Sequence, residues 1–259
     1  MATDQRLTGV ERLFGVTGAR AIQNSHVAVV GLGGVGSWAT ESLARSGVGT
    51  LTLIDFDHVA PSNINRQIQA IDATVGQAKV LAMRDRILTF YPQCKINCIQ
   101  DFVNEDNWPT MLPNGVDALI DACDHIKAKV VMAQWARNNP ECFFIMAGAA
   151  GGKRLAHEVS IADLADVTHD PVLSKVRYQL RKNHAPLRQL KKMGVCCVFS
   201  PEPIAMSNAS SALMSDSAWN NHSYGSSVTV TATSGHCAAG FILNQVAKSA
   251  RVQAKVSDS

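Results

Sequence analysis

A glycine-rich turn near the start of the chain has the composition of a phosphate-binding loop. The segment Gly31-Leu-Gly-Gly-Val-Gly36 has the spacing G-x-G-x-x-G, with glycine at Gly31, Gly33, Gly34 and Gly36. Glycines permit a tight turn and close approach of the backbone to a phosphate, and the free N–H groups of a following helix attract anions. Asp55 comes nineteen residues after Gly36, where a carboxylate can accept hydrogen bonds from a ribose. These features alone fit an NAD-dependent dehydrogenase as well as an ATP-using enzyme.

Polar and basic side chains gather just beyond Asp55. Asn63, Asn65 and Arg66 lie in one predicted loop, and Lys79 lies at the start of the next predicted helix. An NAD site neutralises its diphosphate mainly with backbone N–H groups, whereas side-chain cations beside the glycine turn suit a triphosphate that undergoes reaction. The loop therefore favours ATP.

A single carboxylate follows a later apolar run. Asp124 comes just after a strand predicted at 117–121, at the sheet edge where open α/β sheets bind ligands. One carboxylate at that edge suits Mg²⁺, which keeps several waters and bridges phosphates. We therefore expect ATP and Mg²⁺ as cofactors, with the ion at Asp124.

The elements that must position these residues alternate along the chain. Apolar runs predict strands at 26–30, 50–54, 95–100, 117–121 and 142–147, and amphipathic stretches predict helices at 5–25, 37–46, 76–90 and 126–138. Such alternation implies βαβ units, so we expect a Rossmann-like, doubly wound α/β fold with a mostly parallel sheet. Beyond residue 152 the pattern predicts a strand at 157–161, a basic helix at 172–192, a strand at 195–199, an irregular loop at 201–226 and a helix at 228–248. We expect this part to form a helical and irregular C-terminal appendage.

The composition is that of an ordinary globular protein. Of the 259 residues, 46% are hydrophobic and 17% charged, which argues against a disordered chain. The first residues lack an apolar segment typical of secretion signals, and the apolar stretch 228–247 is interrupted by polar residues, so we expect no membrane insertion. Seven irregularly spaced cysteines without a C-x-x-C pair argue against a disulfide framework and a four-cysteine zinc site. We expect a cytoplasmic protein.

Positive charge is concentrated in one stretch. The basic residues are Lys175, Arg177, Arg181, Lys182, Arg188, Lys191 and Lys192, with no acidic residue among them. By default such a stretch is a solvated helix face, with leucine and valine packed inward. Cations at this density also suit the phosphate backbone of a nucleic acid. Few aromatic residues accompany them, which favours positioning of the nucleic acid over reading of its bases.

Five motifs together resemble the adenylation domain of ubiquitin-activating enzymes, a superfamily that includes bacterial activators of molybdopterin-synthase and thiamine-pathway sulfur carriers. They are Gly31-Leu-Gly-Gly-Val-Gly36, Arg45-Ser-Gly-Val-Gly49, Leu53-Ile-Asp-Phe-Asp57, Ser62-Asn-Ile-Asn-Arg-Gln67 and Gly76-Gln-Ala-Lys79. The resemblance implies nucleotide contacts at Gly34, Asp55, Asn63, Asn65, Arg66 and Lys79, and Mg²⁺ at Asp124. It also implies a homodimer in which Arg12 reaches the phosphates of the neighbouring subunit's ATP.

Within that superfamily the chain is most similar to the bacterial tRNA threonylcarbamoyladenosine dehydratases. The motifs are Gly33-Gly-Val-Gly-Ser-Trp-Ala39, Asn65-Arg-Gln-Ile68, Asp101-Phe-Val103, Gly148-Ala-Ala-Gly-Gly152, Gly194-Val-Cys-Cys-Val-Phe-Ser200 and Val230-Thr-Ala-Thr233. The resemblance implies a tRNA substrate whose threonylcarbamoyl group at adenosine 37 is activated by attachment of AMP from ATP and then cyclised. With such a substrate, we expect the seven basic residues from Lys175 to Lys192 to bind the tRNA backbone. Catalysis would consist of orienting the groups and neutralising phosphate charge with Arg12, Arg66, Lys79 and Mg²⁺.

Other functions stay open at this point. The main alternative is adenylation of the Gly-Gly end of a ubiquitin-like sulfur-carrier protein, but the zinc cysteine pairs of those activators are missing and His125 stands where they have Asn. A nucleotide-sensing protein without turnover is another, and a sulfur-transfer or sulfur-acceptor partner is not excluded. Cys196 stands where the resemblance predicts an acidic residue before Cys197, and both cysteines fit a core strand better than catalysis.

The resemblance also suggests how the chain is divided. We expect an N-terminal helical arm at 1–25, an ATP-binding adenylation core at 26–165, and a C-terminal part at 166–259. The last part would contain the basic helix, a crossover loop and a closing helix.

Overall fold

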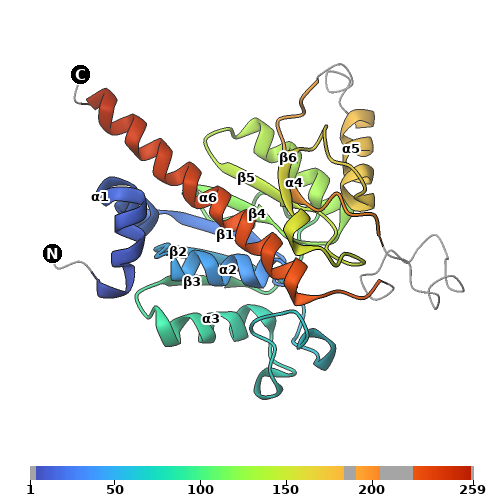
Figure 1. Cartoon of the computed structure of the whole chain (residues 1–259), viewed down its shortest axis with the longest axis horizontal. Helices are drawn as coiled ribbons and strands as arrows, with labels where there is room; N and C mark the ends of the chain where they lie inside the picture. Colours follow the sequence, from blue (N-terminus) through green and yellow to red (C-terminus); the bar gives the residue numbers. More distant parts are fainter. Residues whose placement is uncertain (1–3, 184–190, 205–223, 258–259) are drawn as a thin grey trace, which may run out of the picture.

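A seven-stranded sheet forms the centre of the computed structural model, which describes residues 4–183, 191–204 and 224–257, with side chains up to Val252 (Figure 1). The strands are β1 (His26–Val30), β2 (Thr50–Ile54), β3 (Lys95–Ile99), β4 (Ala118–Asp121), β5 (Phe143–Ala147), β6 (Ser160–Asp163) and β7 (Cys196–Phe199). Their order is β3-β2-β1-β4-β5-β7-β6, and every pair is parallel except β6 with β7. The expected mostly parallel sheet is confirmed.

Helices cover both faces of this sheet. They are α1 (Thr8–Asn24), α2 (Gly36–Arg45), α3 (Lys79–Phe90), α4 (Ile126–Asn138), α5 (Pro171–Asn183) and α6 (Val228–Ser257). Short 3-10 turns lie at Gln5–Leu7, Pro61–Asn63, Asp72–Thr74 and Ala156–Glu158.

Side chains alternate along each strand, so they form a separate core on each face of the sheet. Val27 and Val29 of β1 face a core shared with α1, α2, α3 and α6, whereas Ala28 and Val30 face α4 on the other side of the sheet. A third cluster joins α4, α5 and β7. Because both faces are covered, the central strands β1, β4 and β5 are mostly apolar, as expected for a doubly wound fold.

The sheet reverses its winding between β1 and β4. β1 pairs with β2 on one side and β4 on the other, so the connections leave from the two strands in opposite directions. In open α/β sheets the crevice at the carboxyl ends of such strands binds ligands. This is where the predicted site residues converge.

The structure corrects two predicted boundaries. The basic helix expected at 172–192 ends at Asn183 in the described residues, and Lys191 and Lys192 are not helical. Pro186, within the predicted span, lacks the N–H that a helix interior needs. The closing helix was expected at 228–248 but continues to Ser257. Beyond the predicted end, the Arg251 guanidinium donates to the carbonyl oxygen of Phe14 in α1.

The expected division at residue 165 stays a prediction. β7 belongs to the C-terminal part of that division and pairs with β5 of the adenylation core, and α6 packs on α1 and α2. Within the described ranges, no helix combines the length and hydropathy needed to cross a bilayer.

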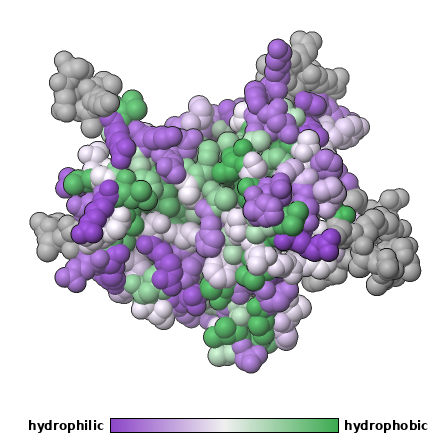
Figure 2. Space-filling model, viewed as in Figure 1, coloured by the Kyte–Doolittle hydropathy of each residue, from purple (hydrophilic) through white to green (hydrophobic). Residues whose placement is uncertain are grey.

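Exposed apolar side chains include those on the segment between β2 and α3 and those on α1. Figure 2 shows green surface on the segment that projects between β2 and α3, where Ile64, Ile71 and Val75 are exposed. On α1, Leu13 and Val16 are also exposed, at 75% and 60% of their surface. Gly15 lies between them with a φ of 70°, so the helix kinks there.

Candidate active site

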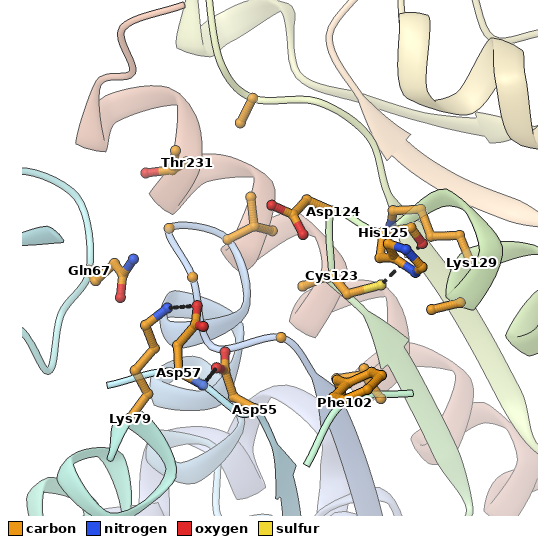
Figure 3. Close-up of a pocket in the computed structure, with 18 of the residues that line it drawn as sticks. Asp55, Asp57, Gln67, Lys79, Phe102, Cys123, Asp124, His125, Lys129 and Thr231 are labelled. Atoms are coloured by element: carbon orange, nitrogen blue, oxygen red, sulfur yellow. Dashed lines mark hydrogen bonds and ion pairs between the residues drawn. The ribbon is translucent and has the colours of Figure 1, made fainter. Parts of the chain in front are cut away.

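A cavity of about 460 Å³ lies at the carboxyl ends of β1, β2, β4 and β5. Its wall includes the predicted site residues Gly31, Gly33, Gly34, Asp55, Asn63, Arg66, Lys79 and Asp124. Figure 3 shows Lys79, Asp57 and Asp55 on one side of this cavity and Cys123, Asp124, His125 and Lys129 on the other. The fold therefore brings together residues that are spread over almost a hundred positions of sequence.

The glycine turn has the close packing that its sequence predicts. Gly31 has a φ of 86°, and a side chain there would lie 2.7 Å from the amide nitrogen of Cys123. A side chain at Gly36 would lie 1.8 Å from the carbonyl oxygen of Gly31, whereas nothing lies within 4 Å of the corresponding position at Gly33. The turn thus needs glycine at its two ends and leaves open space at Gly33, which fits a bound phosphate. Gly36 itself begins α2 and is not part of the cavity wall.

Asp55 is fixed at the end of β2 by two backbone groups. Its Oδ2 accepts a hydrogen bond from the Leu32 amide at 2.5 Å, and its Oδ1 accepts one from the Asp57 amide at 2.8 Å. Burial raises the pKa of the carboxyl, and the charge of Lys79 opposes that rise. Each oxygen keeps a second lone pair, so Asp55 fits the predicted contact with a ribose.

Lys79 is almost completely buried at the first turn of α3. It is 6% exposed, and its Nζ lies 2.8 Å from Oδ2 of Asp57, whose side chain is 65% exposed (Figure 3). A buried ammonium requires such a partner because an isolated charge is costly to remove from water. Asp57 lies in one of the motifs that carry the family resemblance but was not predicted as part of the site.

Arg66 lines the cavity on the loop after β2. Its Nη1 donates to the carbonyl oxygen of Ser62 at 2.7 Å and to Oδ1 of Asn65 at 2.9 Å. Trp38 of α2 donates its indole N–H to the Arg66 carbonyl oxygen at 3.0 Å. The loop is thereby fastened to the helix that follows the glycine turn.

The two asparagines of this loop are placed differently. Asn63 is buried in the cavity wall, and its Oδ1 accepts a hydrogen bond from the Ala60 amide at 3.0 Å. Asn65 is not part of the wall, and its Nδ2 donates to the carbonyl oxygen of Ser226 at 3.1 Å. Asn65 therefore connects the loop to the start of α6, whose Thr231 also reaches the cavity.

Asp124 is exposed beside the cavity, between the end of β4 and the start of α4. A solvent-facing carboxylate at this point fits an ion that keeps water ligands and bridges phosphates. Within the described ranges, no group of three His, Cys, Asp or Glu side chains is placed to hold a metal ion.

A buried ion pair under the cavity was not predicted from the sequence. Lys129 of α4 is 1% exposed, and its Nζ donates to Oδ1 of Asp121 at 3.1 Å and to the carbonyl oxygen of Ala147 at 2.7 Å. It therefore joins the carboxyl ends of β4 and β5. The sequence does contain a signal for it, because Lys129 lies on a helix face with Ile126, Met132 and Ala133 and a lysine there must find a partner.

Arg12 lies on α1 and is exposed, outside the cavity wall. Figure 1 places α1 at the opposite end of the molecule from α5. The structure of one chain therefore does not bring Arg12 to its own site, and its predicted role in the neighbouring subunit stays a prediction.

The predicted tRNA-binding residues do not all serve one surface. Lys175 and Lys182 are exposed on α5, whereas the Arg177 guanidinium donates to the carbonyl oxygens of Leu164 and Val167 at 3.0 and 2.7 Å. Arg181 is half-buried, Lys191 is exposed outside the helix, and Lys192 pairs with Asp166. Arg188 lies outside the described residues.

Cys196 and Cys197 lie in β7 and are not part of the cavity wall. Burial raises the pKa of both thiols, which leaves them protonated and weakly nucleophilic. Cys197 packs in the cluster between α4, α5 and β7. This placement agrees with the expected role in a core strand.

Comparison with known proteins places these features in context. The sequence model of the ThiF family matches residues 5–154. A Haemophilus influenzae protein named tRNA threonylcarbamoyladenosine dehydratase is 35% identical over 247 residues, which cover 95% of this chain and 94% of that protein. Escherichia coli molybdopterin-synthase adenylyltransferase is 37% identical over 118 residues, which cover 46% of this chain and 47% of that protein.

Solved structures show the same similarity along the whole chain. The crystal structure of Escherichia coli tRNA N6-threonylcarbamoyladenosine dehydratase in complex with ATP has a TM-score of 0.86 and 36% identity, and covers 95% of this chain and 96% of that one. A complex of the same enzyme with AMP has a TM-score of 0.85 and 34% identity. Similarity to the dehydratases thus includes the C-terminal part, whereas the match to the sulfur-carrier activator covers less than half of either protein.

Proposed function

This chain belongs to the ThiF family, among the tRNA threonylcarbamoyladenosine dehydratases, and we propose that it uses ATP to cyclise N6-threonylcarbamoyladenosine at position 37 of tRNA. The observation that carries this conclusion is similarity to those enzymes over 95% of the chain, with the glycine turn, Asp55 and Lys79 gathered on one cavity. Adenylation of a sulfur-carrier protein is less well supported, because the activators of those carriers match less than half of the chain.

The reaction has two steps. The carboxylate of the threonylcarbamoyl group attacks the α-phosphorus of ATP, and the bond from that phosphorus to the bridging oxygen breaks. Pyrophosphate leaves, and an acyl-adenylate is formed. A nitrogen or oxygen of the same side group then attacks the acyl carbon, AMP leaves with the electrons of the broken C–O bond, and the attacking group releases one proton. The second step is intramolecular and gains from high effective molarity.

The residues of the cavity wall can serve the first step by binding and orienting ATP. The glycine turn offers space and N–H groups to phosphate, and Asp55 offers oxygens to the ribose. Arg66 and Lys79 neutralise the charge that develops on the leaving pyrophosphate. Lys79 would exchange its contact with Asp57, or share it, when phosphate enters.

A magnesium ion fits beside Asp124. Its chemistry there would be to neutralise phosphate oxygens and to make pyrophosphate a better leaving group. Asp124 would supply one carboxylate ligand, with phosphate oxygens and water completing the set. The exposed position of Asp124 on the cavity wall supports this assignment.

The tRNA would lie over α5. Lys175 and Lys182 are exposed seven residues apart, so they project from the same side of the helix. Arg177 is a less suitable contact because it already satisfies two carbonyl groups. The first residues of α5 are close to the chemistry, since Val172 lines the cavity.

The active form would be a homodimer, with Arg12 of each subunit completing the other's site. The exposed apolar side chains of Leu13 and Val16 on the same helix support an interface at α1. The arm at 1–25, the adenylation core at 26–165 and the C-terminal part at 166–259 would then act as dimer arm, nucleotide site and tRNA-binding region. A sulfur-transfer or sulfur-acceptor protein could join this assembly as a further partner.

The direct test uses modified tRNA. Purified protein is incubated with ATP and tRNA that carries threonylcarbamoyladenosine, and the nucleosides are analysed by mass spectrometry while AMP and pyrophosphate are measured. We expect the mass of the modified nucleoside to fall by that of one water. We also expect one AMP to be released for each nucleoside converted. AMP formation that needs a Gly-Gly-ending carrier protein, and not the modified tRNA, would contradict the proposal.

A further inference from the structure

One buried carboxylate joins the start of α5 to the wall of the cavity. Asp170 is 1% exposed and directly precedes α5. Its Oδ1 accepts a hydrogen bond from the Leu173 amide at 2.9 Å, which is the usual contact of a helix N-cap. Its Oδ2 accepts one from the Ala149 amide at 2.8 Å. Both oxygens are thus engaged, by two elements far apart in sequence.

The segment 148–151 is held closely against this carboxylate. A side chain at Gly148 would lie 2.1 Å from Oδ2 of Asp170, so only glycine fits there without displacing the carboxylate. The Gly148 amide donates to the carbonyl oxygen of Val198 at 2.8 Å, and the preceding carbonyl, of Ala147, accepts from Lys129. The hydrogen bond to Asp170 fixes the next residue, Ala149, which lines the cavity.

Two amides of the same segment have no acceptor among the residues that the structure describes. Gly148, Ala149, Ala150 and Gly151 all line the cavity. In the described part of the chain, the amides of Ala150 and Gly151 donate to no oxygen. Gly151 is buried and Ala150 is half-buried, and backbone amides removed from water are nearly always hydrogen-bonded. A pair of adjacent amides on a cavity wall therefore indicates donors for a bound oxygen or anion.

We propose that Asp170 is a positioning residue, which holds segment 148–151 so that the amides of Ala150 and Gly151 receive the oxygens of the acyl group being activated. This inference rests on the proposed function and names the part of the cavity that holds the threonylcarbamoyl carboxylate. Donors fixed in place before reaction stabilise charge on an acyl oxygen without reorganising.

The same carboxylate connects the proposed tRNA-binding helix, α5, to the cavity wall. Asp170 caps α5 and also accepts a hydrogen bond from Ala149. A tRNA bound on the outer face of α5 would therefore contact a helix that is hydrogen-bonded to the part of the wall that receives the acyl group. The burial that raises the pKa of Asp170, with Lys153 and Lys129 opposing it, also keeps water from competing for its two hydrogen bonds.

The test separates the two hydrogen bonds of Asp170. Serine is a good N-cap but its side chain is too short to reach Ala149, so Asp170→Ser keeps the cap of α5 and removes the hydrogen bond to the wall. Gly148→Ala is a second variant, because it displaces the carboxylate while keeping Asp170. The matched control is Asp163→Ser, since Asp163 also accepts backbone amides, those of Ala165, Met193 and Gly194, but lies outside the cavity wall.

Four quantities are measured for each full-length protein: the single-turnover rate of AMP formation on modified tRNA, the Kd for ATP, the Kd for tRNA, and the Tm. We expect Asp170→Ser and Gly148→Ala to slow AMP formation by about 100-fold, as loss of a preorganised donor does, with both Kd values within about twofold of the unmutated protein. Asp163→Ser is expected to lower the Tm and keep the rate.

Two outcomes would overturn the inference. One is a folded Asp170→Ser protein that forms AMP at the unmutated rate. The other is an equal loss of rate in Asp163→Ser, which would assign the effect to general destabilisation. The unmutated protein tests the proposed function separately. If it forms no AMP on modified tRNA, the proposed function fails, and this inference fails with it.

Discussion

The Nζ of Lys79 lies 2.8 Å from Oδ2 of Asp57 on the wall of the cavity. The lysine is almost completely buried and the aspartate is mostly exposed, so the buried amine is paired with a carboxylate that also faces solvent. A nucleotide phosphate that enters the cavity can take the place of Asp57 without leaving a buried charge unpaired. The pair therefore holds the Lys79 side chain on the cavity wall, where it can bind a phosphate group.

Replacement of this cation gives the first prediction. Lys79→Ala leaves Asp57 able to reach water, so we expect the fold to be retained and AMP formation on modified tRNA to fall by at least about 100-fold, because phosphate charge is no longer stabilised. The rate is measured in single turnover, and circular dichroism checks the fold. Lys95→Ala, at an exposed lysine on the first residue of β3, is the control. Turnover by Lys79→Ala at the control rate would remove Lys79 from the site.

The second prediction concerns Mg²⁺. Chelation of divalent ions is expected to stop AMP formation by the unmutated protein, and Asp124→Ala to lower the rate and to require more Mg²⁺ for half-maximal activity, because one carboxylate ligand is removed. Titration of Mg²⁺ at saturating ATP measures both. Asp106→Ala removes an exposed carboxylate outside the cavity wall and serves as control. An unchanged Mg²⁺ requirement in Asp124→Ala would move the ion to other ligands.

The third prediction concerns the ion pair under the cavity. Lys129→Met leaves the fully buried carboxylate of Asp121 without its partner, which is expected to lower the free energy of unfolding by about 3–5 kcal/mol. Lys129→Met combined with Asp121→Leu is expected to recover most of this loss, because no charge is then buried. Denaturant unfolding of the two variants measures the difference. Equal stability of the single and double variants would contradict this account.

The same variant has a predictable pH dependence. Burial already raises the pKa of Asp121 in the folded protein, and Lys129 is the main opposing charge. Without Lys129 the folded protein binds a proton at Asp121 more readily than the unfolded chain does, so its stability rises as pH falls. The deficit of Lys129→Met is therefore expected to be smaller at acidic than at neutral pH.

Much of this architecture follows from local sequence. Helix 126–138 and strands 26–30 and 50–54 lie where the sequence predicts them, because glycine turns and polar residues bound short apolar runs. The parallel sheet and the cavity wall from Gly31 to Asp124 follow from the order of those elements. Gly31, Asp55 and Asp124 come just after the end of a strand, whereas Arg66 comes from the loop after β2 and Lys79 from the start of α3.

The rest depends on interactions between distant segments. Thr231 reaches the cavity because α6 packs across α2. It lies in the motif Val230-Thr-Ala-Thr233, but the local pattern does not place that motif at the cavity. The two hydrogen bonds of Asp170 depend on where the end of β5 meets the start of α5, which local patterns do not give. Pro186 lies inside the helix predicted at 172–192, and a proline disfavours a helix interior. The prediction followed the basic and apolar pattern on both sides of Pro186 instead.

The fourth prediction concerns the tRNA. Lys175→Glu with Lys182→Glu is expected to weaken tRNA binding and to reduce the slope of log K against log salt by roughly 1 for each phosphate group that the protein no longer neutralises. ATP affinity is expected to be unchanged, since both side chains lie outside the cavity wall. Filter binding at several salt concentrations measures the slope. Lys95→Glu, at the amino end of a strand on the opposite edge of the sheet, is the control, and an equal effect there would indicate nonspecific attraction.

The last prediction tests whether Arg12 acts across a dimer. Arg12→Ala and Lys79→Ala are each expected to be inactive alone, because every site in either homodimer lacks one cation. In a mixed dimer, one site takes its Lys79 from the Arg12→Ala subunit and its Arg12 from the Lys79→Ala subunit, so it is complete. If subunits exchange at random, about half of the dimers are mixed and about a quarter of all sites recover. AMP formation is measured after the two variants are unfolded and refolded together. Recovery would require Arg12 to act in trans, whereas an inactive mixture that is dimeric by light scattering would place Arg12 in the site of its own subunit. Full activity of Arg12→Ala alone would remove Arg12 from the reaction.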